Sequence, residues 1–284
     1  MSKIHDSPSY SRFNLDYEMI VKICQSGIKI PEISETKGLE ILRSLKSDVN
    51  DLFSITARHY LNAGPEGARH FCFLLNHIIL YINLSSLDDI NSVWAIILYK
   101  GHSKDKESDR SYRFISTCPL LAKALDFYIG DLCKSGWAAA QAETQFQGAG
   151  SCHELAALLL TETILFSLFF LMLPIFCIFL DAKSAFDKIL LELCIQAAFL
   201  ASSKNGQVPG QEIIYLDNRL KNRKTFCEYS KILMGPISDR LGVEQGGINS
   251  DKLYCLADRN DSHSELSTWS PHGLSPRGKR WTGR

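Results

Sequence analysis

Residues 175–187 read IFCIFLDAKSAFD, so that six consecutive apolar residues lead directly into an acidic one. An apolar run of this length is typical of a strand buried on both faces, and the residues after it have the pattern of a helix from about 184 to 201. The strand would then deliver the Asp181 carboxylate to the start of that helix. A carboxylate there suits Mg²⁺, which is bound through one or two carboxylates together with substrate phosphates. The alternative is that Asp181 only caps the helix that follows.

The sequence before this junction is the most apolar part of the chain. Residues 163–180 carry no charge, and a run of 18 residues meets the length criterion for a membrane-spanning helix. Pro174 interrupts the run, and helices usually end before a proline. No Lys or Arg flanks the run on its N-terminal side, so the topology signal is also poor. We therefore predict a helix from 153 to about 170, a strand at 175–180 and no membrane span.

Periodicity places further elements on both sides of this region. Apolar residues that recur at helical spacing indicate helices, and the short β-branched and aromatic run VWAIILY indicates a strand. A charged, turn-rich loop follows that strand before extended structure resumes. The expected elements are helices at 39–61, 66–81 and 120–132, and strands at 93–99, 112–116 and 212–216.

The composition is that of a globular protein. The 284 residues include 31 basic and 31 acidic side chains, and 45% are hydrophobic, which is enough to bury a core. Zero net charge excludes a basic field over the whole molecule, so nucleic-acid binding would depend on local patches. Nine cysteines at irregular spacing, without a CxxC pair, are expected to be reduced core thiols. The N-terminus carries no secretion signal, so we expect an intracellular protein, nuclear or cytoplasmic.

Three further segments carry residues suited to binding. Residues 241–250 read LGVEQGGINS, in which glycines let a backbone approach a ligand closely and Gln can hydrogen-bond a base or sugar edge. By itself this segment also fits a turn followed by a helix start. The charged loop from Lys100 to Arg113 can grip phosphate groups, although a solvated loop is the usual explanation of such a run. A basic cluster comes later in the chain and consists of Arg219, Lys221, Arg223 and Lys224.

Together and in this order, these segments resemble the reverse transcriptases of LINE-type non-LTR retrotransposons, over roughly residues 35–255. ILYKGHSKDKESDRSYRFISTCPLLAKALD resembles the fingers segment, and TQFQGAGSCHELAALLLTE the segment before the palm. IFLDAKSAFDKI resembles the first palm motif, and GVEQGGINSDKLY the motif with the Gln and glycines. The resemblance implies an α/β (α+β) fold of partial fingers and palm after a helix-rich N-terminal part. It also implies an RNA template and a DNA primer as partners and Mg²⁺ as the cofactor.

The resemblance assigns roles to individual residues. Asp181 would be the first catalytic carboxylate and a metal ligand, and the Ala182 carbonyl would complete the metal site. Phe186 would be the aromatic gate against a ribose 2′-hydroxyl, the group that distinguishes RNA from DNA nucleotides. Lys100 and Arg113 would hold the incoming triphosphate. The residues expected to lie against the template base and the incoming nucleotide are Gln245, Gly246 and Gly247.

The same resemblance shows what is missing. Polymerase chemistry uses two metal ions about 3.5–4 Å apart, and the family supplies further carboxylates from an aromatic-Ala-Asp-Asp hairpin. The resemblance ends at about Tyr254, and no adjacent Asp pair follows it. Phe114 also stands where the family has a smaller residue. We therefore expect a truncated RNA-directed DNA polymerase domain that is inactive by itself. The alternatives are a non-catalytic nucleic-acid-binding or oligomerising module and, third, a protein without a selected function.

The expected organisation has four parts. A loose lead-in comes first, and a helical region follows it. The partial reverse transcriptase domain comes next, and the polar, Pro/Gly/Ser-rich end is expected to be a disordered tail. The corresponding ranges are 1–34, 35–92, 93–255 and 256–284.

Overall fold

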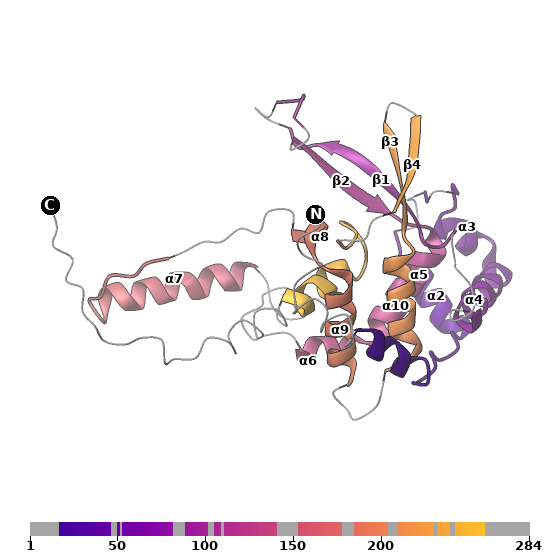
Figure 1. Ribbon diagram of the computed structural model, residues 1–284, viewed down its shortest axis with the longest axis horizontal. Coiled ribbons are helices and arrows are strands. Elements are labelled where there is room, and N and C mark those ends of the chain that lie inside the picture. The colour runs from indigo at the N-terminus through magenta and orange to yellow at the C-terminus, as the bar shows by residue number, and fades with distance from the viewer. Residues whose placement is uncertain are drawn as a thin grey trace.

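The three-dimensional arrangement of the chain comes from a computed structural model. The residues it describes are 17–46, 50–51, 53–81, 89–101, 105–108, 111–140, 153–177, 185–203, 209–229, 232–238 and 242–258. Within these ranges, helices form a body from which a four-stranded sheet projects (Figure 1). The chain is therefore a mixed α and β protein, as the sequence predicts.

Two hairpins from distant parts of the chain form the sheet. Both hairpins are antiparallel, and the strands β1 and β3 pair in parallel, which gives the order β2-β1-β3-β4. The sequence predicts the first hairpin but not the second. The strand bounds are Ser92–Tyr99 for β1, Tyr112–Thr117 for β2, Lys224–Tyr229 for β3 and Ile232–Ser238 for β4.

The strand predicted at 212–216 is wrong, because this segment lies inside helix α10 (Gln211–Lys221). Ile213, Leu216 and Leu220 are all buried, and their spacing of three and four residues puts them on one face of a helix. Isoleucines favour a strand locally. Burial of the helical face against the core outweighs that local preference.

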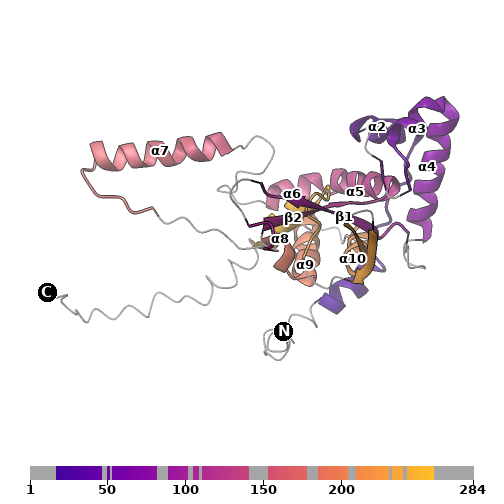
Figure 2. The same ribbon diagram turned by 90° about the horizontal axis from the view of Figure 1, so that it is seen from above.

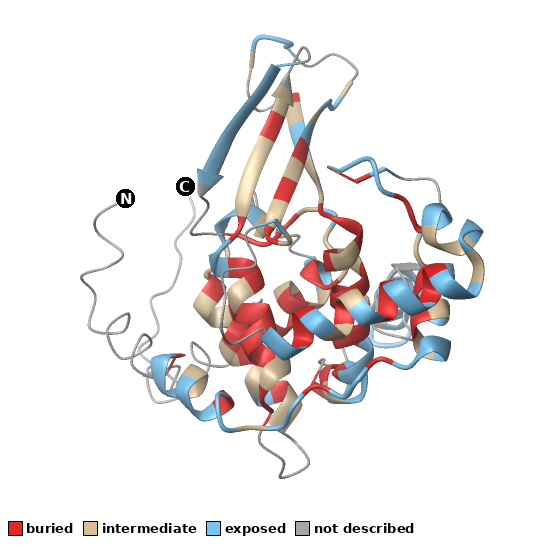
Figure 3. Ribbon diagram, turned by 90° about the vertical axis from the view of Figure 1, so that its right-hand side faces the viewer, coloured by how far each residue is buried: buried red, intermediate tan, exposed pale blue. Residues whose placement is uncertain are grey.

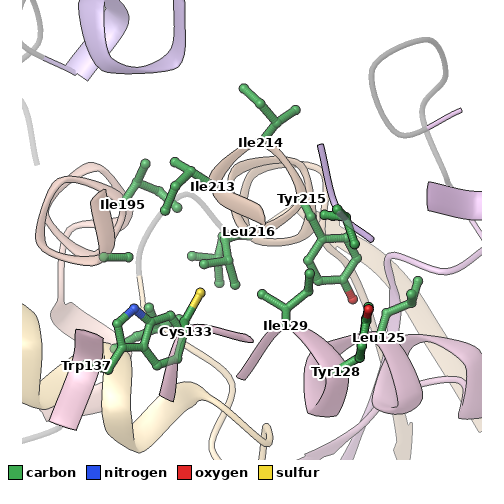
Figure 4. Packing of buried hydrophobic residues seen from close by; sticks show 14 of the residues in the cluster. Leu125, Tyr128, Ile129, Cys133, Trp137, Ile195, Ile213, Ile214, Tyr215 and Leu216 are labelled. Atoms are coloured by element: carbon green, nitrogen blue, oxygen red, sulfur yellow. The ribbon is translucent and has the colours of Figure 1, made fainter. Parts of the chain in front are cut away.

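The centre of the core lies between four helices, and Figure 4 shows some of its side chains; residues of the N-terminal helices belong to the same buried cluster. Leu125 and Ile129 come from α5, Ile195 comes from α9, and all three are closed to solvent. The helix predicted at 120–132 is confirmed. The helices around this core are α5 (Leu120–Leu132), α6 (Lys134–Ala140), α9 (Leu191–Ser202) and α10.

The long helix predicted at 39–61 is two separate helices, and Asp51 explains the break. Its carboxylate accepts the backbone N–H groups of Phe53 and Ile55 at 2.9 and 2.8 Å, and that of Leu120 at 2.8 Å. A side chain that satisfies backbone donors in this way stabilises a turn in place of a helix. The helix predicted at 66–81 is confirmed. After a short helix at residues 17–24, the N-terminal part contains α2 (Glu35–Ser44), α3 (Ala57–Asn62) and α4 (Gly64–Tyr81).

Helix α7 (His153–Phe169) forms where the sequence predicts a helix, but it does not join the core. No side chain within residues 154–177 is buried, and Leu158 and Phe166 are more than half exposed. Figures 1 and 2 both show α7 set apart from the helical body and the sheet. Its apolar residues lie around the whole circumference, a pattern typical of helices that are buried on all sides.

The predicted strand at 175–180 does not form in the part of it that is described. Residues 175–177 belong to no strand, and the Phe176 side chain is 88% exposed. A strand needs neighbours for its backbone groups, and none of the four described strands pairs with these residues. Residues 178–184, which include Asp181 and Ala182, lie outside the described residues.

The helix predicted at 184–201 is present in two pieces, α8 (Ala185–Lys188) and α9. The break between them coincides with a long-range contact, because the Ile189 carbonyl accepts the backbone N–H of Gly242 at 2.8 Å. That carbonyl is therefore engaged by a segment from elsewhere in the chain. The contact also marks where the later glycine-containing segment meets this part of the fold.

Among the described residues, no helix is both long and apolar enough to cross a membrane.

No disulfide links the described cysteines, and all of them except Cys177 are buried, as the sequence predicts for core thiols. Figure 3 shows buried residues concentrated in the helical body and exposed ones at the far end of the sheet.

The predicted tail begins too early, because residues 256–258 continue a helix over 250–258, in which Leu256 is buried. The rest of that tail lies outside the described residues.

Leu125→Ala should lower the free energy of unfolding by about 2–5 kcal/mol, because it leaves a cavity in the core. The same substitution at Leu158 on α7 should cost less than about 0.5 kcal/mol, as at other exposed positions. Urea unfolding of the two variants gives both values. Equal losses at both positions would contradict the placement of α7 outside the core.

Candidate functional site

Residues 242–247, called the glycine turn here, contact the segment that follows the predicted metal carboxylate. The backbone N–H groups of Gly242 and Val243 donate to the carbonyls of Ile189 and Phe186, both at 2.8 Å. Gly242 has φ +83°, and a Cβ there would lie 2.7 Å from the Phe186 carbonyl oxygen. Only glycine combines this backbone conformation with so close an approach.

The glycine turn also contacts the first hairpin. The backbone N–H of Ser116 in β2 donates to the Gln245 carbonyl at 2.9 Å. Gly246 has φ +107°, and a Cβ there would lie 3.1 Å from the Ser116 carbonyl oxygen. The turn therefore bridges β2 and α8, two elements that are distant in the sequence.

A cavity of about 250 Å³ lies between the glycine turn, α8 and the sheet. All four strands contribute to its wall, and the strand register explains how. Ala95 is opposite Ser116 in β2 and opposite Cys227 in β3, so that these three side chains share one face of the sheet. The polar side chains that line the cavity are Ser116, Asp187, Arg223, Thr225, Glu244 and Gln245.

The chemistry of this lining suits a polar ligand. Arg223 is only 5% exposed and contributes a guanidinium to a wall that also carries the carboxylates of Asp187 and Glu244. The Gln245 amide can donate and accept hydrogen bonds at the edge of a base or sugar. Ser116 and Thr225 add hydroxyl groups on the sheet side. The arrangement therefore offers directional binding groups around a small space.

Buried charges lie behind the glycine turn. Arg219 of α10 is 3% exposed, and its Nη2 lies 2.9 Å from Glu244 Oε1. Its Nε lies 3.8 Å from Asp126 Oδ2 of α5, whose other carboxylate oxygen accepts the Tyr215 hydroxyl at 2.8 Å. One guanidinium thus stands between two carboxylates, one of which lines the cavity.

Burial shifts the titration of this cluster. The pKa of Asp126 is raised to about 6, with desolvation as the largest cause; Glu244 acts in the same direction, and Arg219 and the Tyr215 hydroxyl act in the opposite direction. Burial and the Asp126 charge raise the pKa of Tyr215 well above its usual value. Burial alone would lower the pKa of Arg219, but its acidic neighbours, Glu244 first among them, raise it well above the usual range.

The structure brings some of the residues predicted to bind a nucleotide together and separates others. Gln245 lines the cavity, and Gly246 and Gly247 complete the same turn. Phe186 is half-buried beside the turn, with its ring centroid 5.1 Å from that of Tyr254. The predicted catalytic and metal-ligating Asp181 and the predicted Ala182 carbonyl lie outside the described residues.

Lys100 and Arg113 lie in the outer part of the first hairpin. Arg113 is opposite Leu98, and the Lys100 N–H donates to the Ser111 carbonyl at 2.8 Å. Because successive strand residues face opposite sides, Arg113 faces away from the cavity that Phe114 lines. The register therefore does not direct Arg113 into the cavity that Gln245 lines.

The predicted nucleic-acid-binding cluster does not form one exposed patch, and this prediction needs correction. Arg219 and Arg223 are almost completely buried. Lys221 is more exposed, with its Nζ 4.0 Å from the centroid of the Tyr17 ring, and Lys224 is half-buried at the start of β3. The reason is that Arg219 lies on the buried side of the last turn of α10 and Arg223 lies in the cavity wall just after that helix, which a linear run of charges cannot reveal.

Two features of the site were not found from the sequence. Thr225 and Cys227 line the cavity from β3, and a prediction that lacks β3 cannot place them. Asp126 is an acidic residue within an apolar helical pattern, and that contrast was the signal in the sequence that could have indicated a buried charge. It is buried at the centre of the charge cluster.

Mg²⁺ is expected from the resemblance, and the described residues do not fit it. No group of three His, Cys, Asp or Glu side chains in the described part of the chain could hold a metal ion. Glu244 lines the cavity but pairs with Arg219. The Mg²⁺ expectation therefore depends on Asp181.

No model of a known protein family matches the chain, and no curated protein matches it.

Asp126→Asn should remove a fall in stability between pH 4 and pH 6. The folded-state pKa of Asp126 is about 6, above the value of about 3.9 for an unperturbed Asp. The folded state therefore binds more protons than the unfolded state in this window, and stability falls as pH rises through it. Urea midpoints measured across the window should fall for the unsubstituted chain and change less for Asp126→Asn. Asp251→Asn, at an exposed position, is the control; a fall that persists unchanged in Asp126→Asn would contradict the assignment.

Proposed function

We propose that the chain is part of an RNA-directed DNA polymerase of the LINE-type reverse transcriptase class, and that the cavity receives the template base or the incoming nucleotide. One observation carries this proposal. The three segments whose sequences resemble the fingers, the first palm motif and the Gln-Gly-Gly motif all reach the cavity. Phe114 and Ser116 come from the first, Asp187 from the second and Gln245 from the third.

The size of the cavity fits part of a nucleotide. Pockets for drug-sized ligands measure about 300–1,000 Å³, and this cavity measures about 250 Å³. A base with part of its sugar suits that space better than a complete nucleoside triphosphate. The phosphates would then lie toward the outer hairpin, where Lys100 and Lys106 are exposed.

The proposal assigns binding to the described site and assigns metal chemistry to Asp181. Two-metal catalysis needs carboxylates on both ions, so primer extension requires acidic groups in addition to Asp181. The RNA template and the DNA primer are the proposed partners. Such a function places the protein in the nucleus or the cytoplasm.

A second candidate is a non-catalytic module that binds single-stranded nucleic acid, and the outer part of the first hairpin favours it. The rings of Tyr99 and Tyr112 are 5.5 Å apart, and Lys106 Nζ lies 5.8 Å from the Tyr99 ring centroid. Exposed aromatic rings among basic side chains are typical of surfaces on which bases stack without sequence preference. This function needs the hairpin but not the glycine turn.

Gln245→Ala should weaken binding of a fluorescent RNA–DNA template-primer, in the presence of the next complementary nucleotide, by about 5–10-fold. This is the effect of losing one hydrogen bond of about 1–1.5 kcal/mol. Fluorescence anisotropy measures it. The matched control is Gln25→Ala, at an exposed position on the helical side of the molecule, which should bind like the unsubstituted chain. Equal affinities of the two variants would contradict a role for the cavity.

Replacing Lys100, Lys106 and Arg113 together by Ala should reduce the salt dependence of single-strand binding. Three lost phosphate contacts lower the slope of log K against log salt by about 2. The control replaces three exposed basic residues elsewhere, Lys22, Lys29 and Lys134. A lower salt slope in the hairpin variant but not in its control, together with unchanged template-primer binding by Gln245→Ala, would favour the second candidate. A slope that is unchanged by the hairpin substitutions would exclude phosphate binding there.

A further inference from the structure

We infer that Arg219 is a positioning residue for the glycine turn, which it holds against the helical core through Glu244. The inference concerns a residue that the sequence places in a nucleic-acid-binding cluster and the structure places in the interior. Arg219 and Glu244 are both more than nine-tenths buried, and their charged atoms are 2.9 Å apart. The pair joins the last turn of α10 to the wall of the cavity.

The role of this pair is geometric more than stabilising. Removing two charges from water is costly, and apolar replacements of similar volume are often as stable as a buried ion pair. A charge pair differs from an apolar contact because it fixes a distance and a direction. Here the fixed object is Glu244, which directly precedes the Gln245 that lines the cavity.

The other contacts of the turn show what the ion pair adds. Backbone hydrogen bonds hold Gly242 and Val243 to the α8 side, and the Gln245 carbonyl is held to β2. These contacts fix the start of the turn and its fourth residue. Glu244 lies between them, and its carbonyl accepts the Gly247 N–H at 3.1 Å, so that its position also sets the closure of the turn.

A second connection runs from the same cluster to the residue that follows the turn. The Asn249 side-chain amide donates to the Asp126 carbonyl oxygen at 2.6 Å. Arg219 Nε lies 3.8 Å from the Asp126 carboxylate. Helices α5 and α10 therefore hold the turn and the helix start after it as one unit.

The test compares amide hydrogen exchange in the turn with exchange in the core. Arg219→Met and Glu244→Gln should each raise exchange of the Gly247 and Ser116 amides about tenfold more than exchange of core amides, because the buried ion pair that holds Glu244 is broken. Arg219→Lys keeps the charge and should restore part of the protection. Leu220→Ala, the next residue on α10 and also buried, should raise exchange of turn and core amides by similar factors.

Amide exchange and template-primer binding are separate readouts. Together they distinguish this inference from the proposed function, on which its functional meaning rests. Template-primer binding should weaken in Arg219→Met and in Glu244→Gln but not in a Leu220→Ala protein that remains folded. Selective loosening of the turn without any nucleotide binding would support the positioning role and count against the polymerase function. If Arg219→Met does not fold, Glu244→Gln decides, because it keeps the shape of the side chain. Exchange in the turn that rises no more than with Leu220→Ala would overturn the inference.

Discussion

The parallel pairing of β1 with β3 is the contact on which the arrangement of the site depends. Each strand belongs to a hairpin that is local in the sequence, but the two hairpins come from opposite halves of the chain. Parallel pairing requires a long connection, and here the connection contains the helices of the core. One face of the sheet lines the cavity together with the glycine turn, and α5, α9 and α10 form the core of the helical body from which the sheet projects.

The glycine turn brings polar atoms into a region where water is scarce. Gly242, Val243 and Glu244 are buried, and each has a partner: two backbone N–H groups bond to the segment around α8, and the Glu244 carboxylate pairs with Arg219. Buried backbone groups without partners would destabilise the fold. The turn thus has a defined position because its polar groups pair with the segment around α8, with α10 and, through the Gln245 carbonyl, with β2. A defined position is also what a binding site for a planar ligand requires.

Local patterns in the sequence were sufficient for much of the fold but not for the contacts between its parts. Helix α5 and the first hairpin have strong periodicity and lie where it predicts them. The strand expected at 212–216 is helical because its isoleucines pack in the core, a long-range effect that overrides local preference. The helix expected across Asp51 is broken because that carboxylate satisfies backbone donors, including one from Leu120. Burial of Arg219 and Arg223 depends on the same tertiary packing, so a run of basic letters could not distinguish a binding patch from interior charges.

Photo-crosslinking tests the central claim most directly, because it locates the nucleotide on the chain. A template-primer carrying a photoreactive base at the templating position is irradiated with the protein, and the crosslinked peptides are identified by mass spectrometry. The account predicts crosslinks to the glycine turn and to β2, which are hydrogen-bonded to each other and both line the cavity. Crosslinks confined to the N-terminal helices α2 to α4, or no crosslink above that of a competitor-saturated control, would contradict it.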